Sequence, residues 1–213
     1  MVNVVQKGAR PPTGPATIGG GPRAAAARDK LADAVLTHLL DGGSPGESLR
    51  ALAAGVGVSH SLLLYHFGST AGLLAEVHAA CERRERKHLA ALRITGRQPV
   101  SVMRAMWQHL AQPRMWPIYR LGFALRLRDD VPTPGQDRER EAWVSALEPL
   151  VAAFDLDPVR ARDESLLWVA TCRGLLWELV TGADPKRVHH AAERFFTHYQ
   201  PPRPRSRPVG KSS

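Results

Sequence analysis

The chain has 213 residues, of which 44% are hydrophobic and 23% charged, and its formal net charge is +9. This composition excludes a disordered chain and fits one compact unit or a small head on a larger body. The positive charge favours polyanionic partners, nucleic acid among them. Cys81 and Cys172 are the only cysteines, and each lies in an apolar stretch without metal-ligand spacing. We expect both thiols to pack in the core of a protein from a reducing compartment, with redox sensing as the alternative.

Both ends of the chain are basic. Residues 1–23 have no acidic side chain and no apolar periodicity, which predicts a flexible basic arm. Residues 201–213 are predicted to form a disordered basic tail. Each end either contacts nucleic acid or is simply solvated, and the sequence favours neither interpretation.

The start of the chain lacks the apolar segment of a signal peptide, and the most hydrophobic stretch carries Arg173 and Glu178, unlike a membrane span. We expect a cytoplasmic protein without membrane contact.

Between the two ends the apolar residues recur at helical spacing. Leu31, Val35 and Leu39, for example, are four residues apart and lie on one face of a helix. No alternating strand pattern interrupts this spacing. The sequence therefore predicts an all-α fold of about nine helices. Their predicted ranges are 24–40, 48–55, 59–66, 70–95, 99–111, 114–128, 137–154, 158–181 and 185–199.

Two short predicted helices near the N-terminus are joined by a glycine-bearing turn. Leu52 and Ala53 form the inner face of the first helix, and residues 55–58, Gly-Val-Gly-Val, supply the turn. Ser59 is a suitable N-cap for the second helix, because its hydroxyl can accept a hydrogen bond from a free backbone N–H. Such a pair can place its second helix in a DNA major groove. An ordinary helical hairpin without a ligand is the alternative that spacing alone leaves open.

A longer motif includes this pair of helices. It consists of Leu52, Ala53, Gly57, Val58, Ser59, Leu63, Tyr65, His66, Phe67, Ser69, Leu73 and Leu74. The motif resembles the DNA-binding signature of the TetR family of bacterial regulators, and the resemblance extends over residues 24–74. It implies a three-helix helix-turn-helix DNA-binding domain at residues 24–70. It also implies that residues 71–200 form a larger helical domain for ligand binding and dimerisation.

Within this motif we expect contacts with double-stranded operator DNA from polar side chains of the two short helices. The candidates are Ser48, Arg50, Ser59, His60, Ser61, Tyr65 and His66. His66 has an equally good interpretation as an interior residue that braces the motif. Many members of the family have Thr, Tyr and Lys where this chain has Leu62, Leu64 and Thr70, and those side chains commonly hold phosphates. Their loss should weaken DNA binding, which Arg10 and Arg23 of the arm could offset.

The larger domain offers candidates for a pocket and for a dimer surface. The candidate pocket residues, which an ordinary helical core would equally explain, are Trp107, Trp116, Tyr119, Phe123, Trp143 and Trp168. Four arginines within apolar runs either face a ligand or make salt bridges, namely Arg104, Arg120, Arg126 and Arg173. The last two helices, residues 158–199, are apolar over more than one stripe, which favours a homodimer interface.

Taken with the resemblance, these features predict a TetR-like repressor that a small hydrophobic effector releases from a palindromic operator. The alternative is a ligand- or partner-binding protein of the same fold with weakened specific DNA binding. An enzyme is not expected, because the chain lacks G-x-S-x-G, H-E-x-x-H and phosphate-loop signatures. We expect no cofactor and no metal. The late histidines His189, His190 and His198 have no neighbouring carboxylate or cysteine pattern that would make a metal site.

Overall fold

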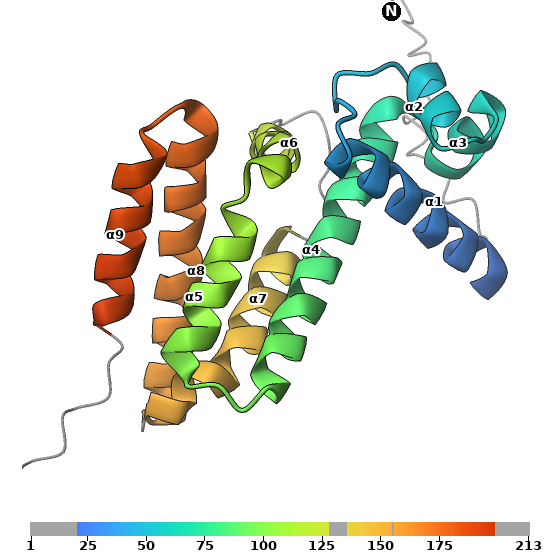
Figure 1. Ribbon diagram of the computed structural model, residues 1–213. Coiled ribbons are helices and arrows are strands. Elements are labelled where there is room, and N and C mark those ends of the chain that lie inside the picture. The colour runs from blue at the N-terminus through green and yellow to red at the C-terminus, as the bar shows by residue number, and fades with distance from the viewer. Residues whose placement is uncertain (1–20, 128–135, 155, 199–213) are drawn as a thin grey trace, which may run out of the picture.

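The computed structural model describes residues 21–127, 136–154 and 156–198, which form nine α-helices and two short 3-10 helices without any strand (Figure 1). The all-α prediction is therefore confirmed, and each predicted range contains a helix. The elements are α1 Pro22–Leu40, α2 Leu49–Gly55, α3 His60–Phe67, α4 Thr70–Ile94, α5 Pro99–Leu110, η1 Pro113–Met115, α6 Trp116–Arg126, α7 Gln136–Val151, η2 Ala152–Phe154, α8 Pro158–Thr181 and α9 Pro185–Thr197.

The first helix begins earlier than the sequence predicted. Pro22 and Arg23, which we assigned to the flexible arm, form the first turn of α1. Proline is well placed there, because the first N–H groups of a helix have no partner within the helix and proline lacks one. Pro158 and Pro185 begin α8 and α9 in the same way, each after an aspartate whose side chain accepts backbone N–H bonds. The rest of the arm, with Arg10, and the tail lie outside the described residues.

Helices α1 to α3 form a small head at one end of the long helix α4 (Figure 1). The head has its own apolar centre, in which Val35, Leu52 and Leu63 are fully buried. Two ion pairs hold α1 against α4: Arg28 Nη2 lies 2.7 Å from Glu76 Oε1, and Arg83 Nη2 lies 3.2 Å from Asp29 Oδ1. Both ion pairs are partly exposed, so the apolar packing of α1 on α4 does most to fix how the head is oriented on α4.

The body consists of α4 to α9. Helices α7 and α8 pack closely on each other, α6 lies against α8, and α9 contacts α5 and α8. Its core contains large side chains such as Trp107, Trp168 and Phe196. Gly122 of α6 lies so close to His78 of α4 that a Cβ at this position would overlap the imidazole ring. No helix of the described ranges is long and apolar enough to cross a membrane.

Candidate DNA-binding head and ligand cavity

Three serines fix where the helices of the head begin. The Oγ atom of Ser48 accepts a hydrogen bond from Ala51 N at 3.2 Å, that of Ser59 from Leu62 N at 3.1 Å, and that of Ser69 from Gly72 N at 3.0 Å. Each hydroxyl satisfies a donor that the first turn of the helix leaves free. Ser59 is thus the N-cap that the sequence predicted. Ser48 and Ser59 are exposed, so both also remain available at the surface.

The turn between α2 and α3 depends on one glycine conformation. Gly57 has φ +70°, in the left-handed region that side chains disfavour. The next amide, Val58 N, donates to Ala53 O at 2.9 Å and closes the turn. The turn sets α3 across α2, as the predicted helix-turn-helix requires.

The outer face of α3 carries a mixture of polar and apolar side chains. Ser61 is exposed, and Tyr65 is 63% exposed, whereas Leu63 and Phe67 of the inner face are buried. His60 is half-buried, and Arg50 of α2 is exposed. The predicted contact residues thus lie on the accessible side of the head or at its border, and their contacts with DNA remain a prediction.

The positions that depart from the family pattern are also on the surface. Leu62 is 38% exposed and Leu64 is 45% exposed, while Thr70 is half-buried at the start of α4. The two leucines therefore do not contribute to the core of the head. His66 is half-buried, with its ring edge to face against Tyr65 at 5.1 Å between centroids.

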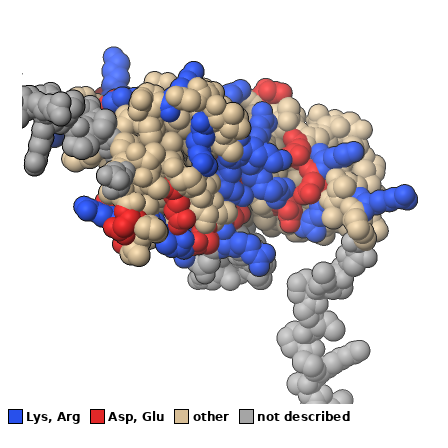
Figure 2. All heavy atoms as spheres, turned by 90° about the horizontal axis from the view of Figure 1, so that it is seen from below, with Lys and Arg blue, Asp and Glu red and all other residues tan. Residues whose placement is uncertain are grey.

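Several basic side chains near the head already have partners. Arg28 pairs with Glu76, and its guanidinium lies 5.4 Å from the centre of the Phe67 ring. The sequence analysis missed this pair, which joins residues 48 positions apart. Figure 2, a view from below, shows Lys and Arg gathered near the middle of that face with acidic groups beside them. A surface groove next to α1 and α4 has the same mixed character, with Asp29, Asp33, Arg83, Arg84 and Lys87.

Four of the six predicted pocket aromatics line one cavity in the body. Tyr119, Phe123, Trp143 and Trp168 surround a volume of about 50 Å³ bordered by α4, α6, α7 and α8. The structure does not bring Trp107 and Trp116 to this cavity. The Trp107 indole donates to His189 Nδ1 at 3.1 Å, and the Trp116 indole donates to Ala111 O at 3.1 Å. These two side chains pack elsewhere in the body.

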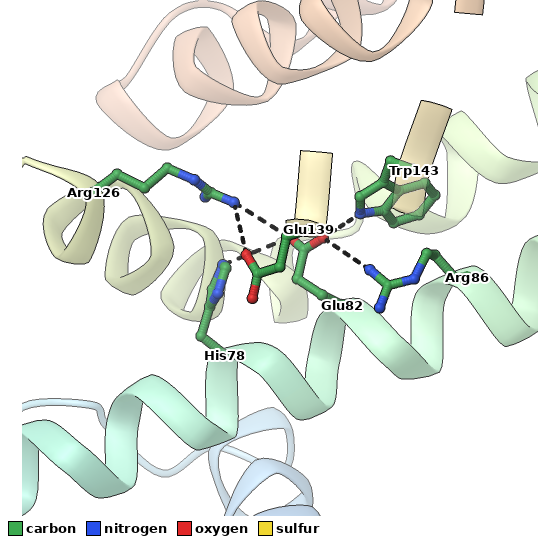
Figure 3. A network of polar contacts seen from close by, with 6 residues as sticks. All are labelled: His78, Glu82, Arg86, Arg126, Glu139 and Trp143. Carbon is green, nitrogen blue, oxygen red and sulfur yellow. Dashed lines mark hydrogen bonds and ion pairs between the residues drawn. The ribbon is translucent and has the colours of Figure 1, made fainter. Parts of the chain in front are cut away.

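A network of charged groups lies beside the cavity (Figure 3), and Glu82 and Arg126 of this network line it. At the centre of the network is Glu82 of α4, which accepts a hydrogen bond from the Trp143 indole. Arg86 Nη1 lies 3.9 Å from Glu82 Oε2, and Arg126 Nη2 lies 4.0 Å from Glu82 Oε1. Arg126 also pairs with Glu139 at 3.5 Å. The four-residue spacing from Glu82 to Arg86 indicates a shared helix face, but the members from α6 and α7 lie on separate helices, and the network was not predicted from the sequence.

Three titratable groups around the cavity are uncharged because of burial. Burial lowers the pKa of His78 to about 4, so its imidazole is neutral although Nε2 lies 3.6 Å from Glu82 Oε1. Burial also raises the pKa values of Cys81 and Cys172, whose side chains line the cavity as free thiols. Both cysteines are thus buried, as the core-packing prediction states, and burial keeps the thiolate needed for redox sensing from forming.

Glu85 and His109 form a close pair beside the same cavity. Their atoms Oε2 and Nε2 are 2.6 Å apart, and Glu85 is only 3% exposed. Burial raises the pKa of Glu85 to about 7 and lowers the pKa of His109. Glu85 therefore carries less negative charge at neutral pH than an exposed carboxylate does.

The four arginines singled out from the sequence divide into two pairs. Arg104 Nε lies 2.7 Å from Glu193 Oε2, and Arg120 Nε donates to Val180 O at 2.8 Å, so both hold helices together. Arg126 and Arg173 line the cavity.

Within the described ranges, no cluster of three His, Cys, Asp or Glu side chains is arranged to hold a metal ion.

Comparison with solved structures identifies the fold. The chain superposes on a TetR-family transcriptional regulator from Pectobacterium atrosepticum with TM-score 0.67 and 17% identity, covering 84% of this chain and 95% of that one. A TetR-family regulator from Rhodococcus sp. gives TM-score 0.60 and 19% identity, covering 81% and 97%. The TetR-family repressor AlkX from Dietzia sp., implicated in biodegradation of n-alkanes, gives TM-score 0.52 and 14% identity, covering 85% and 98%.

The likeness extends over the head and the body together, since the shared part exceeds nine tenths of each of these relatives. No family model matches the sequence, and no curated protein matches it significantly. At identities below one fifth, the shared arrangement of helices is the evidence. The described part of the chain has the fold of the TetR-family transcriptional regulators.

Proposed function

We propose that this protein is a DNA-binding transcriptional regulator and not an enzyme. The observation that carries the proposal is the capped helix α3, whose outer face presents Ser61 and Tyr65 to solvent at one end of a TetR-type fold. A helix held in this way can enter a major groove with its first turn toward the base edges. The remaining predicted contacts, from Ser48, Arg50, Ser59, His60 and His66, belong to the same proposal. A regulator of this kind acts in the cytoplasm.

The proposed protein works as a homodimer on a palindromic operator. The outer side of α8 supports this, because Leu166, Leu167 and Trp177 are all exposed there, beside the open position of Gly174. Most of the exposed side chains of α9 are polar, among them Arg187 and Arg194. We propose that α8 supplies the apolar centre of the interface and α9 its polar rim. Such a dimer presents two α3 helices to two half-sites of one operator.

The proposed regulator represses, and binding of a small ligand in the body releases it from DNA. Support comes from the position of α4, which begins in the head and lines the cavity through His78 and Glu82. A ligand that binds more tightly to one orientation of α4 would shift the balance between DNA-binding and free states.

A mobility-shift titration with the DNA flanking the gene of this protein tests DNA binding. The two variants Ser61→Glu and Ser101→Glu make a matched pair, because both serines are exposed in the first turn of a helix and only Ser61 belongs to the head. We expect Ser61→Glu to abolish the shift by repelling phosphates, and Ser101→Glu to bind like the unmodified protein. Equal loss in both variants, or binding that unrelated competitor DNA removes, would contradict the proposal.

The exposure of Leu62 and Leu64 favours a second candidate function, a ligand- or partner-binding protein of this fold with weak specific DNA affinity. The same mobility-shift titration distinguishes the two candidate functions. Sequence-independent binding with a steep salt dependence supports the second candidate, because phosphate contacts alone give such binding.

A further inference from the structure

Three hydrogen-bond donors around the cavity lack a partner. They are Tyr119 Oη, Trp168 Nε1 and Arg173 Nη2, which are buried and make no hydrogen bond within the described part of the chain. All three residues line the cavity, although they come from α6 and α8. An unsatisfied buried donor is costly, and buried polar groups in folded proteins are normally paired. Three such donors around one cavity indicate that an acceptor binds between them.

The charged side chains on and beside the cavity wall indicate which charge the acceptor group of the ligand carries. Glu82 and Glu139 are balanced by Arg86 and Arg126, which lie within 4.0 Å of them. Arg173 has no carboxylate within ion-pair distance in the described ranges. Burial lowers the pKa of Arg173, yet a guanidinium stays protonated at neutral pH. Apart from Glu85, which burial leaves largely protonated below about pH 7, the described charged groups of the cavity therefore include one positive charge, that of Arg173, without an ion-pair partner.

The remaining wall of the cavity is apolar, which indicates that the rest of the ligand is apolar too. Leu110, Phe123, Val169 and Leu176 line the cavity, and the buried thiol of Cys172 stays protonated beside them. A volume of about 50 Å³ is well below the roughly 300–1,000 Å³ of a drug-sized pocket. A doubly charged phosphate would leave one charge unpaired against these walls, whereas a single carboxylate matches the single free guanidinium.

We propose that the cavity binds a small monocarboxylic acid with an apolar body, whose carboxylate accepts hydrogen bonds from Arg173, Tyr119 and Trp168. The inference rests on the proposed function, because it assigns a ligand class to the effector cavity. The carboxylate lies at Arg173, Tyr119 and Trp168, and the apolar body lies along Phe123 and Leu176. A preformed set of donors and a fixed charge give selectivity for the carboxylate over the corresponding neutral amide.

Calorimetric titration of the full chain tests the ligand class, with acetate and butanoate as probes and their amides as neutral counterparts. We expect at least one carboxylate to bind and its amide to bind at least tenfold more weakly. Equal binding of acid and amide would overturn the proposal, and so would failure of both carboxylates to bind.

Variants assign the binding to the three donors. Tyr119→Phe removes only the hydroxyl, so we expect carboxylate affinity to fall about tenfold while the melting temperature of the ligand-free protein stays level or rises. A purely structural hydroxyl would instead lower the melting temperature and leave the affinity unchanged. Arg173→Met should remove the preference for acid over amide. The control Arg160→Met changes an exposed arginine of the same helix and should keep that preference.

The outcome is separable from that of the proposed regulator function. The mobility shift without ligand tests DNA binding alone, and calorimetry without DNA tests the ligand class alone. If a carboxylate binds but DNA does not, the ligand class holds and the regulator proposal fails. If DNA binds specifically but acid and amide bind equally, the regulator proposal holds and the ligand class fails.

Discussion

Phe123 of α6 and Trp177 of α8 meet edge to face, with ring centroids 5.1 Å apart and an interplanar angle of 90°. Phe123 lines the cavity, and Trp177 is 41% exposed on the outer side of α8. One aromatic pair thus connects the proposed ligand cavity with the proposed dimer surface. A ligand that displaces Phe123 must move Trp177 or lose this contact, worth about 0.5–1.5 kcal/mol beyond buried area.

Leu167→Glu is expected to dissociate the homodimer. Leu167 is exposed on α8, and a carboxylate there would be buried without a partner in an apolar interface. Sedimentation velocity should show the unmodified protein as a dimer and the variant as a monomer with unchanged helical content. Ile94→Glu, at an exposed apolar position at the end of α4, is the control and should remain dimeric. A monomeric unmodified protein would refute the proposed interface.

Gly122→Ala is expected to destabilise the body by about 1–3 kcal/mol, the usual range for overpacking. The added methyl would overlap the buried ring of His78, which must turn away from Glu82 to make room. Ser101→Ala is the control, because Ser101 also lies inside a helix but is exposed and outside the proposed dimer surface. It should leave the stability unchanged or raise it by less than about 0.7 kcal/mol through the helix preference of alanine. Urea unfolding measures the change in stability of both variants. Equal changes would contradict the close packing of α4 and α6.

Thr70→Lys should strengthen DNA binding. It places a lysine at the start of α4, where many members of the resembled family carry one to hold a phosphate. The slope of log affinity against log salt should steepen by about 0.9 for one added phosphate contact. Thr197→Lys adds the same charge at the end of α9, away from the head (Figure 1), and should change the slope little. Equal slopes for the two variants would indicate a general charge effect.

Glu85 should make the protein less stable as pH rises. Its folded-state pKa is about 7 because of burial, above the ordinary value of 4.5, so the folded protein binds more protons than the unfolded chain between these values. The contribution is fully present below pH 4.5 and is lost as pH rises to about 7.

Glu85→Gln should therefore match the unmodified protein near pH 5 and exceed its stability above pH 7. Denaturant unfolding across this range measures the difference in stability between the variant and the unmodified protein. His78, whose pKa is near 4, has the opposite trend with pH, but it contributes equally to both proteins and so cancels from this difference. Glu178→Gln, at an exposed carboxylate on α8, controls for the loss of a charge. A constant difference between Glu85→Gln and the unmodified protein at all pH values would show that Glu85 does not titrate in this range.

The sequence by itself determined the helices, and it placed their starts to within two residues. Ser59 caps α3 as predicted, and Gly57 adopts the positive φ that the turn needs, because both depend on contacts a few residues apart. Aspartate before proline similarly begins α8. The all-α architecture followed, since helical spacing runs through the whole described chain.

Only the tertiary structure decided which side chains share a cavity. Trp107 and Trp143 have similar apolar surroundings in the sequence, yet one donates to His189 and the other to Glu82. Likewise Arg104 is paired, whereas Arg173 has no carboxylate within ion-pair distance among the described residues, because their surroundings come from helices far apart in the chain. Helical periodicity identifies the face of a helix on which a residue lies, whereas the partner depends on how the helices cross and how closely they approach.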